Sequence, residues 1–195
     1  MKKILFVIGL TICSFAKTYA QNKIELGIKG GVNFSNMTSD SFAENDNKTG
    51  FHIGVLAEIP FGNKFSVQPE LLYSSQGTKA KLIMYGGGPM PSEYSLDYIQ
   101  IPVLAKIYII QNLSVEIGPT FSFLVNDNEK TNSIKNTDIG NIFEFGGAIG
   151  ASYKIKFGLF GSLRYVHGFT VALDRENHIE DAKNRGFQLG LGYMF

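Results

Sequence analysis

Eight charged residues stand in segments where apolar and polar residues alternate, and they are the first candidates for chemistry. All eight fall on the polar face of their segment. Charges of both signs on one buried face predict a network of ion pairs and hydrogen bonds, because buried charges must be paired. A gate or a proton path is the functional alternative. The eight residues are Glu25, Lys29, Glu58, Glu70, Lys106, Glu116, Glu144 and Arg164.

Eight segments of period two must position these charges, and each reads as a β-strand. The clearest sets Leu113, Val115 and Ile117 against Ser114 and Glu116. From their places in the strands, Lys29, Glu70, Glu116 and Arg164 are expected near mid-height of the sheet. The predicted strands cover about 23–34, 51–61, 65–76, 94–108, 113–123, 143–153, 157–165 and the last residues up to Phe195.

The connections between these segments alternate in length. Short turns are predicted at 62–63, 110–112 and 154–156, and long polar loops at about 36–50, 77–93, 126–141 and 170–184. This alternation is typical of an all-β, eight-stranded antiparallel up-and-down transmembrane β-barrel with both termini on the short-turn side. That side is expected to face the periplasm.

The alternative is a water-soluble barrel or sandwich with its apolar face turned inward. The many glycines of the polar face argue against it, because glycine weakens a strand and adds nothing to a soluble surface. The narrow interior of an eight-stranded barrel, in contrast, requires small residues among large ones. The glycines are Gly27, Gly31, Gly54, Gly118, Gly146, Gly150, Gly158, Gly190 and Gly192.

Aromatic residues gather near both ends of the predicted strands and suggest two interfacial girdles. Near the short-turn end we expect Phe61, Phe65, Tyr108, Tyr153, Phe157, Tyr193 and Phe195. Near the other end we expect Phe34, Phe51, Tyr94, Phe123, Phe143 and Phe169.

The first twenty residues predict a signal peptide, cleaved between Ala20 and Gln21. Residues 21–195 then form one barrel domain. Cleavage removes the only cysteine, so the exported chain contains no disulfide. It also removes three lysines, which leaves acidic residues slightly in excess and no electrostatic footprint for nucleic acid. No cofactor motif is present.

Weaker candidates for chemistry each have a simpler explanation. His167 and His52 lack the partners that catalysis requires and are expected near a membrane interface and the rim of the lumen. The acidic cluster of residues 174–181 lacks the ligand spacing of an EF-hand and is expected to be a solvated loop. The glycine run at 86–88 lacks the Lys-Ser/Thr of a phosphate loop.

Several segments resemble the outer-membrane β-barrel family of porin-family or PorT-like proteins. They are Gly27–Ser35, Gln68–Gly77 and Leu96–Lys106, with Gly118-Pro119 and Leu163–Tyr165. The resemblance implies a small OmpA- or OmpX-like barrel in a Gram-negative outer membrane. It implies contact with outer-membrane lipid and lipopolysaccharide. It also implies that Tyr193 and Phe195 form the signal that the barrel-assembly machinery reads.

The sequence therefore predicts a monomeric, non-enzymatic barrel whose four external loops serve surface interaction or envelope integrity. A narrow porin-like channel for small solutes is the first alternative, and an accessory role in a secretion system is another. A lipid-modifying enzyme is a further alternative, but lipid A deacylases carry a His-x-Ser pair. Here His167 is followed by Gly168 and Phe169, with no hydroxyl at that spacing. The partner of the loops is not specified by any motif.

Overall fold

The computed structural model describes residues 23–38, 42–82, 90–131, 134–136, 140–173 and 182–195. In these ranges eight long antiparallel strands follow one another around a closed ring, and a short ninth strand extends one hairpin. The predicted eight-stranded up-and-down barrel is confirmed. The strands are β1 (Glu25–Thr38), β2 (Phe42–Pro60), β3 (Phe65–Leu82), β4 (Met90–Ile110), β5 (Leu113–Thr131), β6 (Ile134–Asn136), β7 (Phe143–Lys154), β8 (Leu159–Gly168) and β9 (Lys183–Met194).

The last strand closes the ring by pairing with the first. β9 runs antiparallel to β1 from Gly27 opposite Met194 to Thr38 opposite Lys183. The amide of Phe195 continues the ladder by donating to the carbonyl of Leu26 at 2.8 Å. Within the described ring each long strand therefore has a hydrogen-bonded neighbour on both sides, which is the condition for strands in a medium that cannot hydrogen-bond.

Side chains alternate between the outside and the inside of the barrel along the long strands, and in the middle of the barrel most outward groups are apolar and most inward groups are polar. On β1, Leu26 and Ile28 are more than half exposed, whereas Lys29 is 2% exposed. On β8, Leu163 is 54% exposed and the neighbouring Arg164 is 1% exposed. A soluble protein has the opposite arrangement, with apolar side chains inside. Apolar side chains on the outside are expected where hydrocarbon surrounds the barrel.

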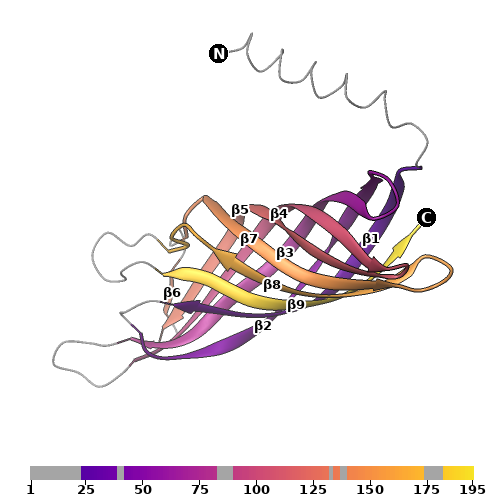
Figure 1. Ribbon diagram of the computed structural model, residues 1–195. Helices are drawn as coiled ribbons and strands as arrows, with labels where there is room; N and C mark the ends of the chain where they lie inside the picture. The colour runs from indigo at the N-terminus through magenta and orange to yellow at the C-terminus, as the bar shows by residue number, and fades with distance from the viewer. Residues whose placement is uncertain (1–22, 39–41, 83–89, 132–133, 137–139, 174–181) are drawn as a thin grey trace, which may run out of the picture.

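The ring is much taller over β2 to β5 than over β7 to β9 and β1. β4 has 21 residues and β8 has 10. In Figure 1 the beginning of β2 and the end of β3 reach beyond β8 and β9 at the end opposite the C-terminus. We call this end the hairpin end and the opposite one the short-turn end.

The prediction of long irregular loops at 36–50, 77–93 and 126–141 is wrong for most of these residues, which continue the strands. Hydrogen bonding pairs residues 44–47 of β2 with 78–81 of β3, and the pairing of β3 with β4 reaches Met90. Apolar periodicity ends where the strands leave the apolar band, but backbone pairing does not require apolar side chains. The strands therefore extend further than their hydrophobic pattern.

The predicted short turns join the strands at the short-turn end. Gly62, Phe157 and Gly158 adopt positive φ there, and Phe157 does so in a fully exposed turn. The predicted signal peptide and its cleavage site at Ala20 and Gln21 lie outside the described residues, as do the glycine run at 86–88 and the acidic cluster at 174–181.

Candidate functional site

Arg164 joins opposite walls of the lumen. It extends from β8, and its guanidinium donates two hydrogen bonds to Glu70 of β3, at 2.8 and 2.9 Å. Its Nε donates to Glu116 of β5 at 2.8 Å. β3 and β8 stand four strands apart in a ring of eight, so this bidentate pair crosses the full width of the barrel.

Lys29 of β1 completes a central ring of four charges. Its Nζ lies 3.8 Å from Glu70 Oε2, and both side chains are almost fully buried. The ring combines two cations with two carboxylates and carries no net charge. The four residues expected at mid-height therefore meet, although they come from four different strands.

Three polar groups near this ring converge on Gly190 of β9. A Cβ at Gly190 would lie 2.7 Å from Cε of Lys29, 2.9 Å from Oγ of Ser162 and 3.1 Å from Nε2 of His52. Within the described residues, Lys29 Nζ, Ser162 Oγ and His52 Nε2 have no hydrogen-bond partner. A Cβ at this position would have to displace the ends of side chains from three other strands.

His52 is not at the rim of the lumen, where it was predicted. It is 1% exposed, and its Nδ1 lies 2.8 Å from Oδ1 of Asn33. The prediction failed because β2 begins at Phe42 instead of Phe51, which moves His52 from the start of the strand to its interior.

A second charged layer lies toward the short-turn end. Lys106 Nζ is 3.0 Å from both Glu58 Oε2 and Gln68 Oε1, and Ser66 donates to Glu58 at 2.8 Å. The hydroxyl of Tyr108 also donates to Glu58. Tyr108 therefore faces the lumen and does not belong to the predicted girdle. Its position two residues after Lys106 places it on the inward face.

The remaining predicted charges lie nearer the two ends. Glu25 is only half-buried and pairs with Lys154 at the short-turn end. Glu144 is buried and accepts hydrogen bonds from Asn184 Nδ2 at 2.8 Å and from the Tyr98 hydroxyl at 3.4 Å. No cation pairs with Glu144 among the residues that the structure describes.

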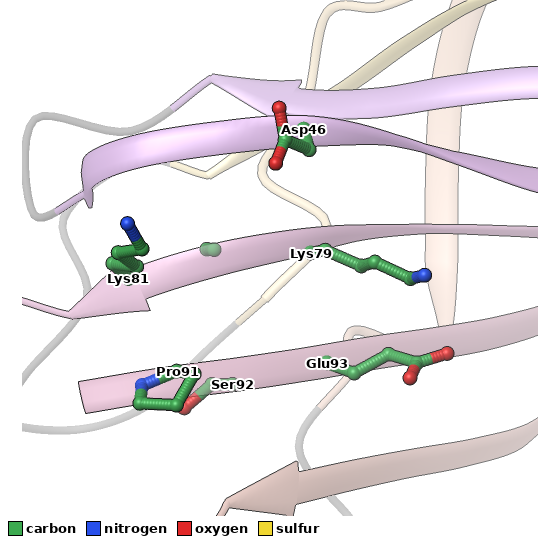
Figure 2. A pocket seen from close by; sticks show the side chains of 7 residues that line it. Asp46, Lys79, Lys81, Pro91, Ser92 and Glu93 are labelled. Atoms are coloured by element: carbon green, nitrogen blue, oxygen red, sulfur yellow. The ribbon is translucent and has the colours of Figure 1, made fainter.

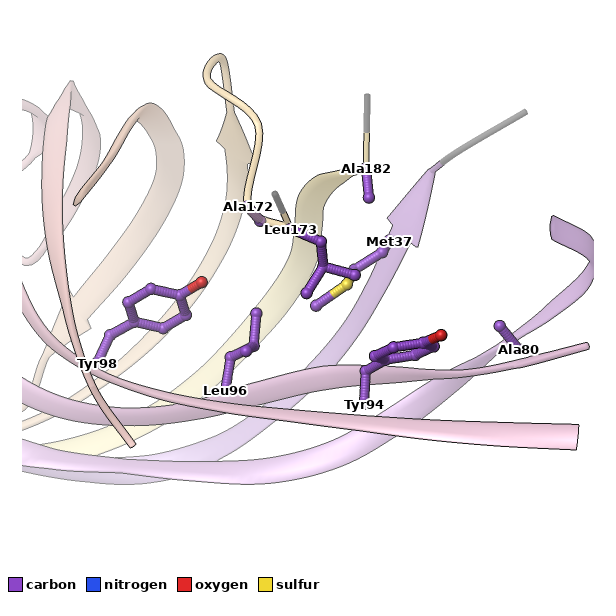
Figure 3. Close-up of a cluster of buried hydrophobic side chains, with 8 residues drawn as sticks. All are labelled: Met37, Ala80, Tyr94, Leu96, Tyr98, Ala172, Leu173 and Ala182. Atoms are coloured by element: carbon purple, nitrogen blue, oxygen red, sulfur yellow. The ribbon is translucent and has the colours of Figure 1, made fainter. Parts of the chain in front are cut away.

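An apolar cluster fills the lumen at the hairpin end, and we call it the plug. Figure 3 shows its eight members, with three side chains of β4 meeting residues next to β8 and β9. Leu173 is 1% exposed, and its backbone bridges to Gly140. The members are Met37, Ala80, Tyr94, Leu96, Tyr98, Ala172, Leu173 and Ala182.

The plug corrects one girdle prediction and reveals residues that sequence reasoning missed. Tyr94, predicted at the outer interface, is fully buried inside the barrel. Tyr94, Leu96 and Tyr98 share the even-numbered face of β4 with Gln100, which was recognised as inward. All three lie within the predicted strand 94–108, and applying that alternation to its first residues would have found them.

A smaller apolar cluster lies between the central ring and the short-turn end. Leu56, Phe160 and Met194 all point inward and are buried. A cavity of about 10 Å³ lies between this cluster and the Glu58–Lys106 layer. That volume is close to the minimum for one water molecule.

The other predicted girdle residues lie on the outside of the barrel. Phe123 and Phe143 pack together with ring centroids 5.3 Å apart, and Tyr165 packs on Phe187 at 5.1 Å. His167 also faces outward, between Tyr165 and Phe169. Its neighbours are aromatic rings, and it has no hydroxyl or carboxylate partner among the described residues.

Beyond the aromatic residues, the outer face of the hairpin end becomes charged. Lys48 Nζ lies 3.2 Å from Glu93 Oε1, and Asn126 donates to Asp97 at 2.9 Å. Figure 2 shows a polar groove across β2, β3 and β4 in this region. Its lining residues are Asp46, Lys79, Ala80, Lys81, Pro91, Ser92 and Glu93.

The described residues contain no group of three or more histidine, cysteine or carboxylate side chains arranged to hold a metal ion. The same residues form no helix that is long and apolar enough to cross a membrane.

Comparison with known families decides the identity of this barrel. The profile of the family described as outer membrane protein beta-barrel domain matches residues 19–174. The chain belongs to this family. Together with the apolar outer face, membership establishes an outer-membrane β-barrel. No curated protein sequence matches the chain.

Solved structures share the fold of this outer-membrane barrel at low sequence identity. Ail, the attachment invasion locus protein of Yersinia pestis, is 15% identical with a TM-score of 0.54. Neisserial surface protein A is 11% identical with a TM-score of 0.57. In both comparisons the match covers 89% of this chain and 100% of the other. Ail has also been crystallised with the heparin analogue sucrose octasulfate.

Proposed function

We propose that this outer-membrane barrel is a non-enzymatic surface protein. Its filled lumen acts as a rigid core, and the long ends of strands β2 to β5 extend outside the cell as an interaction surface. The short-turn end then faces the periplasm. One contrast carries the proposal. Paired charges cross and fill the lumen, whereas at the hairpin end a sheet with a polar outer face extends beyond the rest of the barrel.

The lumen favours a structural role over transport. Arg164 and Glu70 bridge opposite walls, so a solute would have to break a buried ion pair to pass. The plug and the Leu56–Phe160–Met194 cluster place apolar side chains on both sides of this bridge. An eight-stranded barrel has an interior just wide enough for such side chains.

The projecting hairpins favour surface interaction. Cations and carboxylates alternate on their outer face. Lys48 forms an ion pair with Glu93, and Lys79 stands opposite Glu93 in the sheet. Such a surface is hydrated and of mixed charge, so it suits a polar protein partner better than an apolar one. The strand pairing holds it in a defined shape, which limits the entropy lost on binding.

Conductance across a planar bilayer separates this function from a channel. We expect the purified chain to give no steady openings, and we expect the same of Leu173→Ala, because the charged bridge remains. Steady wild-type openings that substitution of Arg164 or Lys29 abolishes would establish transport and overturn the proposal.

A deletion strain tests the interaction role. Loss of attachment to protein-coated surfaces is expected, with restoration by the wild-type gene but not by Lys79→Glu/Lys81→Glu. The matched control, Lys154→Glu, changes a charge at the short-turn end and should restore attachment. A strain that attaches normally but leaks solutes or fails in secretion would contradict the proposal.

A further inference from the structure

We propose that the outer face of β8, β9 and β1 at the hairpin end binds a phosphate group of the glycolipid in the outer leaflet. The site consists of Lys183, Arg185 and His167, and we call it the basic patch. It rests on the proposed function in one respect, since the hairpin end must lie outside the cell.

The patch lies at the height of lipid headgroups. Arg185 stands opposite His167 of β8 and Asn36 of β1 in the sheet, and it points outward with Lys183. Two residues further along β9, Phe187 packs on Tyr165 in the aromatic row. A strand rises about 3.4 Å per residue, so along β9 Arg185 lies roughly 7 Å and Lys183 roughly 14 Å beyond the aromatic row. Aromatic rows mark the edge of the hydrocarbon, so this height is that of the headgroups.

The cations of the patch are not neutralised by the described part of the protein. Arg185 is exposed and Lys183 is half-buried, and neither side chain forms an ion pair or hydrogen bond with another described residue. Their outward neighbours on β1 are the uncharged Asn36 and Thr38. The patch therefore presents positive charge to an anion from outside.

On the opposite sector of the barrel, formed by β2, β3 and β4, the outward cations lie beside carboxylates. There Lys48 is paired with Glu93, Lys79 stands between Asp46 and Glu93 in the sheet, and Asp97 lies nearby on the outer face. Carboxylates at this density repel phosphate. Among the described residues, the charge distribution thus favours an anion site on the wall of β8, β9 and β1.

The three side chains of the basic patch fit the phosphate of a lipid better than they fit a carboxylate or a sulfate carried by a mobile polymer. The planar fork of Arg185 matches two phosphate oxygens, Lys183 adds a point charge, and His167 adds an N–H donor. Leu163 and Leu189, both more than half exposed, form the wall below the patch. A ligand with acyl chains and a phosphate contacts both regions at once, which commits the site to a phosphorylated lipid.

Binding of lipid A by the full mature chain in detergent micelles tests the site. We expect lipid A to raise the thermal unfolding temperature in a saturable, salt-sensitive manner. Lysine and arginine contacts to phosphate are charge-assisted, so Lys183→Ala/Arg185→Ala should weaken binding by at least about tenfold. The matched control, Lys79→Ala/Lys81→Ala, removes the same charge from the opposite sector and should stay within about twofold of wild type.

Three outcomes would overturn the proposal. Lipid A stripped of its phosphates could bind as tightly as intact lipid A. Phosphatidylglycerol or inorganic phosphate could bind equally well, which would leave a general anion site. The control variant could lose as much affinity as the patch variant.

The orientation is tested separately, in whole cells, by labelling Lys79→Cys with a membrane-impermeant reagent. Labelling supports the proposed function, and its absence refutes the outward orientation and the glycolipid assignment. Micellar binding would still report whether the patch recognises a phosphorylated lipid.

Discussion

Replacing Arg164 with methionine removes the cation that joins β8 to β3 and β5. The side chain is fully buried and donates three hydrogen bonds to two carboxylates, all at 2.8 to 2.9 Å. Lys29 remains 3.8 Å from Glu70, but Glu116 is left without its cation. Removing one partner of a buried ion pair costs about 3–5 kcal/mol, and we expect a loss in this range.

Equilibrium urea titration of the refolded chain, followed by circular dichroism because it contains no tryptophan, measures the free energy of unfolding. Combining Arg164→Met with Glu116→Gln removes the stranded charge. The double variant should therefore be more stable than Arg164→Met alone, with a coupling of about 1–3 kcal/mol.

Lys154→Met is the matched control. It also removes a cation from an ion pair, but Lys154 and Glu25 are partly exposed at the short-turn end, where such a pair contributes at most about 1 kcal/mol. If Arg164→Met costs no more than Lys154→Met, or if Glu116→Gln restores nothing, the central ring does not hold the walls together and the reasoning is refuted.

Three further substitutions test other parts of the barrel. Gly190→Ala places a Cβ 2.7 Å from a buried lysine side chain and should cost about 1–3 kcal/mol in urea titration, whereas Gly30→Ala, with its nearest neighbour at 3.6 Å, should cost much less; equal losses would contradict the packing around Gly190. Leu173→Ala opens a cavity in the plug and should lower the free energy of unfolding by about 2–3 kcal/mol, so an unchanged urea midpoint would mean that the plug is loosely packed. Phe195→Ser should reduce the amount of barrel found in the outer-membrane fraction. The control, Phe157→Ser, removes an exposed aromatic residue from a turn and should not reduce that amount. Equal amounts for both variants would remove the basis for a terminal assembly signal.

The number of strands, their order and the side on which most residues lie were predictable from the sequence, with Tyr94 and Tyr108 as exceptions. These features depend on local rules: side chains alternate with period two, and the turns between neighbouring strands are short on one side. Arg164 and Glu116 were placed inward by parity alone, without knowledge of their partners. The heights of the strand ends were harder to predict, because polar hairpins pair through their backbones without an apolar pattern. Tyr94 was misplaced for a different reason: it was assigned to a girdle from its place at the predicted start of the strand, although its even number puts it on the inward face with Gln100.

Only the closed ring decided which inward residues meet. Arg164 and Glu70 are separated by 94 positions in the chain and by half the circumference of the barrel. Their contact depends on the tilt of the strands and on the stagger between every neighbouring pair, and these accumulate around the ring. The same accumulated geometry carries Leu173 over the lumen to Tyr94 and Leu96. Periodicity along one strand determines a residue's face, but a contact across the barrel requires the register of all the strands between.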